Sequence, residues 1–124
     1  MKTPVFQSGE VIYRADTCGP VHDAAHRGDL EIFAFSRGQY PGKPLPQNTL
    51  TGLRSIGFWN SAHEQHWGLD WHRNEGIEIM FLLQGNETYE TSSGRWSLNV
   101  GDVTLCPPWQ FHRVGNPTFG ISTC

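Results

Sequence analysis

The stretch WHRNEGIEIMFLLQG, residues 71–85, decides how this chain folds. Apolar and polar side chains alternate around Glu78, and an apolar run then ends at a glycine. Such alternation indicates a β-strand, because neighbouring residues of a strand point to opposite faces of a sheet. We therefore predict a strand over residues 77–85. The histidine, amide and carboxylate side chains beside it are candidate functional groups.

Short segments of the same kind precede and follow this strand. Turns recur at intervals of about eight to ten residues, which is typical of an antiparallel sandwich or barrel. The 14 glycines and eight prolines of the chain suit such a turn-rich, all-β fold. Further strands are predicted at 30–38, 53–60, 86–92, 96–100, 101–107 and 111–115, with a short one at 10–16.

At 124 residues the chain is long enough for a single domain. We expect residues 1–29 to form an arm, with at most one helical turn at 21–29, and residues 30–124 to form a barrel. The segment 39–52, rich in proline and glycine, is expected to be an ordered loop. A last, short strand is expected within residues 118–124, at the end of the sequence. The barrel is therefore expected to lack its last strands, and a fragment of a longer protein is one alternative.

Composition excludes several classes of function. The formal net charge is −3 and the nine Lys and Arg residues are scattered, so no basic face for nucleic acid is expected. No apolar run resembles a signal peptide or a membrane span. Cys18, Cys106 and Cys124 contain no Cys-x-x-Cys pair, which favours a reducing cytoplasm, and Cys106 is expected to be a buried small residue. No nucleophile motif is present, so an enzyme is not the first expectation.

Two groups of residues have a regular spacing. The first is His72, Asn74, Glu78 and Gly85, and the second is Gly101, Pro107, His112 and Asn116. These spacings resemble the two motifs of cupins, which are double-stranded β-helix barrels of the jelly-roll kind. Three positions depart from the cupin pattern: Asn74 replaces a histidine, Trp109 replaces a glycine, and His66 stands where the leading glycine is usual.

A narrower resemblance covers residues 30 to 117. The segments RGQYPGKPLP (37–46), 52–79 and GDVTLCPPWQFHRVGNP (101–117) resemble the amino-terminal effector-binding and dimerisation domain of AraC-type transcription regulators. The resemblance implies a cupin-like barrel that binds a small-molecule effector, of which a sugar is one example, and forms a homodimer. It implies DNA binding only through a helix-turn-helix domain that these residues do not include.

The cupin resemblance also implies that His72, Glu78 and His112 converge inside the barrel. Two imidazoles and a carboxylate suit a divalent transition metal such as Zn, Fe, Ni or Mn, with one position left open. Asn74 offers only a neutral amide oxygen at the position where a metal cupin has a second histidine. The sequence therefore favours an organic ligand without a required cofactor, and the metal ion stays an alternative.

The expected ligand-binding residues share the inner face or the mouth of the barrel. They are His72, Asn74, Glu78, Met80, Trp109 and His112. Two interpretations of Trp109 are open, since a tryptophan at this place either stacks on a flat ligand or plugs the core. Two other functions are alternatives to the regulator: a small metal-dependent cupin enzyme of the dioxygenase or sugar isomerase type, and a stand-alone small-molecule-binding module.

Two further features of the sequence have simple expected roles. The pairs His22 and His26, and His63 and His66, have chelate-like spacings but lie in polar segments, so we expect solvated loop or turn residues. The apolar row Ile77, Ile79, Phe81 and Leu83 points away from the barrel interior and needs cover. A partner subunit or another element of the same chain is expected to provide it.

Overall fold

The computed structural model of the chain describes residues 3–16, 18–115 and 118–124, so Asn116 of the second motif lies outside the described residues. Strands account for 45% of the described residues and helix for 8%. The prediction of an all-β class is therefore confirmed. No helix in the described part of the chain is long and apolar enough to cross a membrane.

The elements follow the predicted order closely, with one helix among them. They are β1 (Val5–Ser8), β2 (Val11–Arg14), α1 (Gly19–Arg27), β3 (Glu31–Ser36), β4 (Lys43–Pro44), β5 (Ser55–Ser61), β6 (Leu69–His72), β7 (Glu78–Phe81), β8 (Gln84–Thr91), β9 (Gly94–Asn99), β10 (Val103–Cys106), β11 (His112–Val114) and β12 (Ser122–Thr123). Three strands were not predicted from the sequence: β1 lies in the expected arm, β4 lies in the segment 39–52 that was expected to be a loop, and β6 lies between two predicted strands.

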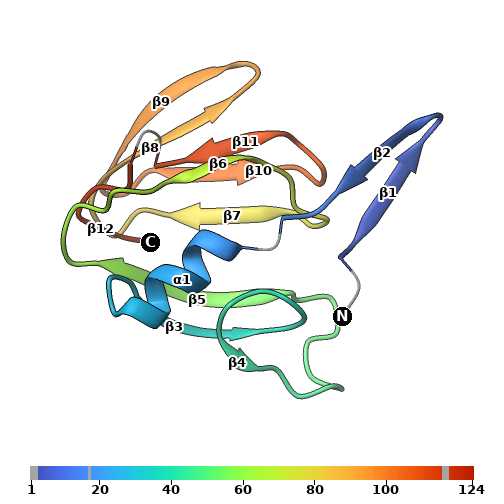
Figure 1. The fold of residues 1–124 in the computed structure, drawn as a ribbon, viewed down its shortest axis with the longest axis horizontal. Helices are drawn as coiled ribbons and strands as arrows, with labels where there is room; N and C mark the ends of the chain where they lie inside the picture. The colour runs from blue at the N-terminus through green and yellow to red at the C-terminus, as the bar shows by residue number, and fades with distance from the viewer. Residues whose placement is uncertain (1–2, 17, 116–117) are drawn as a thin grey trace.

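The strands form two main layers (Figure 1). One layer contains β3, β4 and β5, and the other contains β6, β8, β9 and β11. The short strand β12 joins them, because Ser122 pairs with Ser61 of β5 on one side and with Gly85 of β8 on the other. Strands β7 and β10 pair antiparallel as a separate two-stranded sheet.

Helix α1 is longer than the single turn expected from the sequence. Pro20 lies at its start, where proline costs no helical hydrogen bond, and Gly28 ends it in a left-handed conformation with φ 79°. Val21 and Ala24, three residues apart on one face, are fully buried. They pack in the same core cluster as Leu69 and Leu82, so the helix belongs to the core.

Gly85 is the second residue of β8, so the single strand predicted over residues 77–85 is in fact β7 followed by the start of β8. Gly85 has φ 79°, and a Cβ atom there would lie 1.9 Å from the carbonyl oxygen of Ile121. Only glycine permits both this backbone conformation and the close approach of β12. The glycine that ends the stretch 71–85 therefore has a structural cause.

Candidate functional site

Three strand ends bring the candidate residues together. His72 is the last residue of β6, Glu78 the first of β7 and His112 the first of β11. His112 pairs directly with His72 in the β6–β11 register. One potential ligand atom from each of the three side chains lies within 4.8 Å of the other two. Among the described residues, this is the one cluster of at least three such groups, and we call it the triad.

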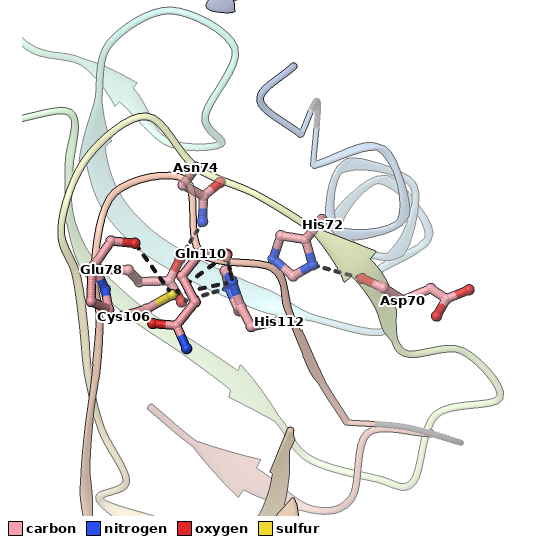
Figure 2. A network of polar contacts seen from close by, with 8 residues as sticks. Asp70, His72, Asn74, Glu78, Cys106, Gln110 and His112 are labelled. Atoms are coloured by element: carbon pink, nitrogen blue, oxygen red, sulfur yellow. Dashed lines mark hydrogen bonds and ion pairs between the residues drawn. The ribbon is translucent and has the colours of Figure 1, made fainter. Parts of the chain in front are cut away.

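Both imidazoles of the triad are oriented by backbone carbonyls. His72 Nδ1 lies 2.7 Å from the carbonyl oxygen of Asp70, and His112 Nδ1 lies 3.0 Å from that of Gln110. A carbonyl oxygen only accepts, so each Nδ1 carries the proton and donates. In the neutral rings Nε2 then presents a lone pair. Figure 2 shows His72 between Asp70 on one side and His112 on the other.

The contact between Glu78 and His112 is favourable only if a cation lies between the two side chains. Glu78 Oε1 lies 3.7 Å from His112 Nε2, and the His112 side chain is fully buried. A carboxylate and an imidazole lone pair repel each other unless a proton or a metal ion lies between them. The ring centroids of His72 and His112 are 4.2 Å apart, so the second imidazole faces the same space.

The pKa values of the three triad side chains are shifted by burial and by their mutual contacts. Burial alone would lower the pKa of His112, but contacts with Cys106 and the Glu78 carboxylate outweigh burial and raise it to about 10. Burial alone would raise the pKa of Glu78, but the close contact with His112 and the charges of both histidines lower it. The pKa of His72 is lowered by burial and by the neighbouring His112 charge. One proton therefore resides preferentially on His112.

Asn74 has a different role from the ligand that it replaces in the motif. It follows β6 and does not share that strand with His72. Its Nδ2 donates a hydrogen bond to Glu78 Oε2, as Figure 2 shows. The amide thus holds the carboxylate in place, in the manner of the outer groups that orient metal ligands.

Several buried polar atoms around the triad have no hydrogen-bond partner. They are Asn74 Oδ1, Tyr89 Oη, Thr104 Oγ1 and His112 Nε2. Leaving a buried polar atom unpaired costs about 1–3 kcal/mol, so native proteins rarely do so without a functional reason. Sequence reasoning missed Tyr89 and Thr104. The signal for Thr104 was present, because it alternates with Cys106 along β10 and so shares its inner face.

Cys106 is buried as predicted, at 2% exposure, but it also contacts the triad. Its Sγ lies 3.2 Å from His112 Nδ1, and Cys106 pairs directly with Glu78 in the β7–β10 register. Cys106 is therefore a contact partner of His112, and no spacing in the sequence indicates this contact.

Trp109 lies beside the triad at the rim. It adopts φ 64°, a left-handed conformation that glycine adopts more readily than tryptophan. Its backbone N–H donates to the carbonyl oxygen of Asn74 at 2.8 Å, and its ring stacks on Phe6 of β1 with centroids 5.7 Å apart. Met80 is half-buried and packs against the hydrophobic core.

The β1–β2 hairpin is held close to the same rim. The guanidinium of Arg73 lies over the ring of Tyr13 at 4.6 Å and over that of Phe111 at 4.3 Å. The backbone N–H of Asp16 donates to the carbonyl oxygen of Arg73 at 2.8 Å. Aromatic and backbone contacts thus fix the hairpin beside the residue that follows His72.

The other histidines do not join a comparable cluster. His26, His63 and His66 are exposed, as expected for solvated residues. His22 differs, since it lies half-buried in α1 with its Nε2 2.8 Å from the carbonyl oxygen of Gln39. This hydrogen bond gives His22 a structural role.

Two hollows lie away from the triad. One is a cavity of about 10 Å³ between Trp59, Trp67 and Phe119, with room for a single water molecule. The other is a surface depression around Asp29 and His63. Neither is lined by any of the six predicted ligand-binding residues. Bonds of about 2.1 Å from the triad side chains to an ion need only small shifts of these side chains.

No protein-family model, curated protein or solved structure matches the chain. The structure itself defines a mostly β protein with a His–Glu–His cluster at the ends of three strands, in which His112 is buried and His72 and Glu78 are half-buried.

Proposed function

We propose that this chain is the effector-binding and dimerisation domain of an AraC-type transcription regulator, built as a cupin-like jelly-roll barrel. The sequence motifs support the family, and the observation that carries the binding function is the triad with its unpaired buried polar atoms. Such a domain acts in the cytoplasm and contacts DNA through a separate helix-turn-helix domain.

The unpaired atoms indicate what an effector has to supply. Thr104 and Tyr89 offer hydroxyl groups, and Asn74 offers an amide oxygen, so a polar ligand with several donors and acceptors gains hydrogen bonds that the free protein lacks. Trp109 at the rim offers an aromatic face. Effector binding then shifts the population of domain arrangements in the regulator.

A second candidate is a metal-dependent cupin, which includes enzymes of the dioxygenase or sugar isomerase type. The specific observation in its favour is the orientation of the two imidazoles, whose Nδ1 atoms are bound by carbonyls. His72, Glu78 and His112 would hold a divalent Zn, Fe, Ni or Mn ion. When bound, such an ion supplies Lewis-acid chemistry at its open position.

Metal content separates the two candidates. Protein purified without an affinity tag is analysed for bound metals, and its melting temperature is measured with a panel of sugars and other small polar molecules. The regulator predicts no stoichiometric metal and a stabilising small molecule, whereas the metal-dependent cupin predicts about one ion per chain.

Single substitutions then test whether the ion or the effector binds at the triad. Glu78→Gln is expected to lower the affinity for a metal ion by about 100-fold or more because it removes the anionic ligand. Trp109→Ala is expected to abolish binding of a flat organic effector. Glu64→Gln, at an exposed position, is the matched control. Binding that is unchanged in both site variants contradicts a site at the triad.

A further inference from the structure

The outer face of the two-stranded sheet formed by β7 and β10 is apolar along its whole length. In the antiparallel register Phe81 pairs with Val103 and Ile79 with Leu105. Ile77 and Leu83 continue the same alternation of side chains just beyond the two ends of β7, and both are exposed. No polar or charged side chain occupies any of these six positions. We call them the β7–β10 face.

The large side chains of this face are strongly exposed. Their exposed fractions are 66% for Ile77, 55% for Ile79, 57% for Phe81, 61% for Leu83, 51% for Val103 and 64% for Leu105. Six side chains of this size, each more than half exposed, present on the order of 600 Å² of apolar surface. This is at the upper end of what single soluble chains leave in contact with water.

We propose that a second copy of this chain covers the β7–β10 face, with the two sheets packed against each other across a twofold axis. A standard interface buries about 800 Å² on each partner, and the apolar face with a narrow rim reaches this area. The proposal deepens the dimerisation part of the proposed function and is independent of what occupies the triad.

The chemistry of the face favours a second copy over another partner. A surface without charges or hydrogen-bonding side chains is matched only by an equally apolar surface, and a twofold dimer supplies one by symmetry. Two sheets pack face to face at about 10 Å when their outward side chains interdigitate. The resulting contact closes, so it does not propagate into fibres.

A second apolar surface of the chain serves as the internal comparison. On the outer face of β3 and β5, Phe33 stacks on Phe58 with ring centroids 5.0 Å apart, and Phe35 pairs with Ile56. The same face ends in the polar pair Glu31 and Asn60. A polar end limits the area that a flat partner can cover without burying a charge.

Sedimentation equilibrium at micromolar concentrations tests the proposal on the whole chain. The wild type is expected to be a dimer, and Ile79→Glu and Ile79→Lys are each expected to weaken dimerisation by about 100-fold or more, because each buries two like charges. Mixing the two variants is expected to restore a 1:1 heterodimer, since Ile79 is central in the face. Phe33→Glu is the matched control and is expected to remain a dimer.

Every result of this experiment either supports or overturns the proposed dimer. A monomeric wild type overturns it, as does a dimer that persists in both Ile79 variants or is lost in Phe33→Glu. Circular dichroism verifies that the variants fold, which is expected because Ile79 is exposed in the single chain. If they do not fold, Leu105→Gln on the same face replaces them. A monomer that still binds an effector at the triad would overturn the dimer and leave effector binding intact.

Discussion

In the described part of the chain, the triad and a second polar cluster differ in how their hydrogen bonds are satisfied. In the triad and its neighbours, atoms of Asn74, Thr104 and His112 lack partners. In the other cluster, centred on Gln65, the corresponding bonds are made within the protein. This contrast separates polar groups that support the fold from polar groups that are available to a bound ion or ligand.

Gln65 is 5% exposed and uses both ends of its amide. Its Nε2 lies 2.9 Å from the carbonyl oxygen of His63, 3.1 Å from that of Asp29 and 3.2 Å from Ser61 Oγ. Its Oε1 accepts a hydrogen bond from the indole of Trp67 at 3.1 Å. This side chain joins the end of α1 to the segment before β6, so its role is structural.

The largest expected effect on stability is at Gln65. Gln65→Ala removes four contacts and leaves the Trp67 indole N–H without its acceptor, so we expect a loss of about 2 kcal/mol in the free energy of unfolding. Urea denaturation measures it. The exposed neighbour Glu64→Ala is the control. A Gln65 variant as stable as the control would show that the satisfied cluster does not support the fold.

The next largest effect is expected from substitutions at two buried threonines, Thr104 and Thr91. Thr104 Oγ1 has no partner, whereas Thr91 Oγ1 accepts a hydrogen bond from the backbone N–H of Ser93 at 3.1 Å. Thr104→Val removes an unsatisfied hydroxyl and is expected to stabilise the free protein by about 1 kcal/mol. Thr91→Val is expected to destabilise it by a similar amount. Thermal denaturation measures both changes. If the two substitutions shift the melting temperature in the same direction, the predicted difference between the two threonines is wrong.

The smallest expected effect is a pH dependence at Glu87. Its carboxylate accepts hydrogen bonds from Ser122 Oγ at 3.1 Å and from the Thr88 N–H at 3.2 Å, but burial raises its pKa above the usual 4.5. A raised folded-state pKa gives stability that is complete below 4.5 and is lost as the pH rises through the folded-state pKa.

Glu87→Gln does not titrate at this position, and its amide oxygen still accepts from Ser122. The stability of the variant relative to the wild type is therefore expected to rise between about pH 4 and about pH 8. Chemical denaturation across this range checks the sign. A difference that is constant with pH, as expected for the control Glu64→Gln, would show that the carboxylate of Glu87 is not desolvated.

The strands were predictable where side chains alternate. Residues 30–38 and 101–107 have a regular period, and β3 and β10 lie within them. Strand β6 was missed because its first half follows a polar segment, and its pairing with β11 comes from distant sequence. Helix α1 was underestimated because only Val21 and Ala24 of its nine residues are buried.

The candidate site was predictable from motif spacing only in part. The resemblance to the cupin motifs implied the convergence of His72, Glu78 and His112, and the structure brings these three residues together. It did not indicate that Asn74 holds Glu78 or that Cys106 contacts His112, because hydrogen bonds between strands depend on register and side-chain direction. Register is set by tertiary pairing that the sequence of one segment does not contain.

The central claim is that the triad holds two imidazoles aimed at one shared position. Long-range proton–nitrogen correlation spectra test it most directly, because they show which nitrogen of each ring carries the proton and at what pH it titrates. We expect the His72 Nδ1 to carry the proton with Nε2 bare at neutral pH, and the ring to titrate below 6.5. We expect His112 to stay protonated through neutral pH and to titrate near 10. Neutral rings with the proton on Nε2, or ordinary titration of both histidines, would contradict the account.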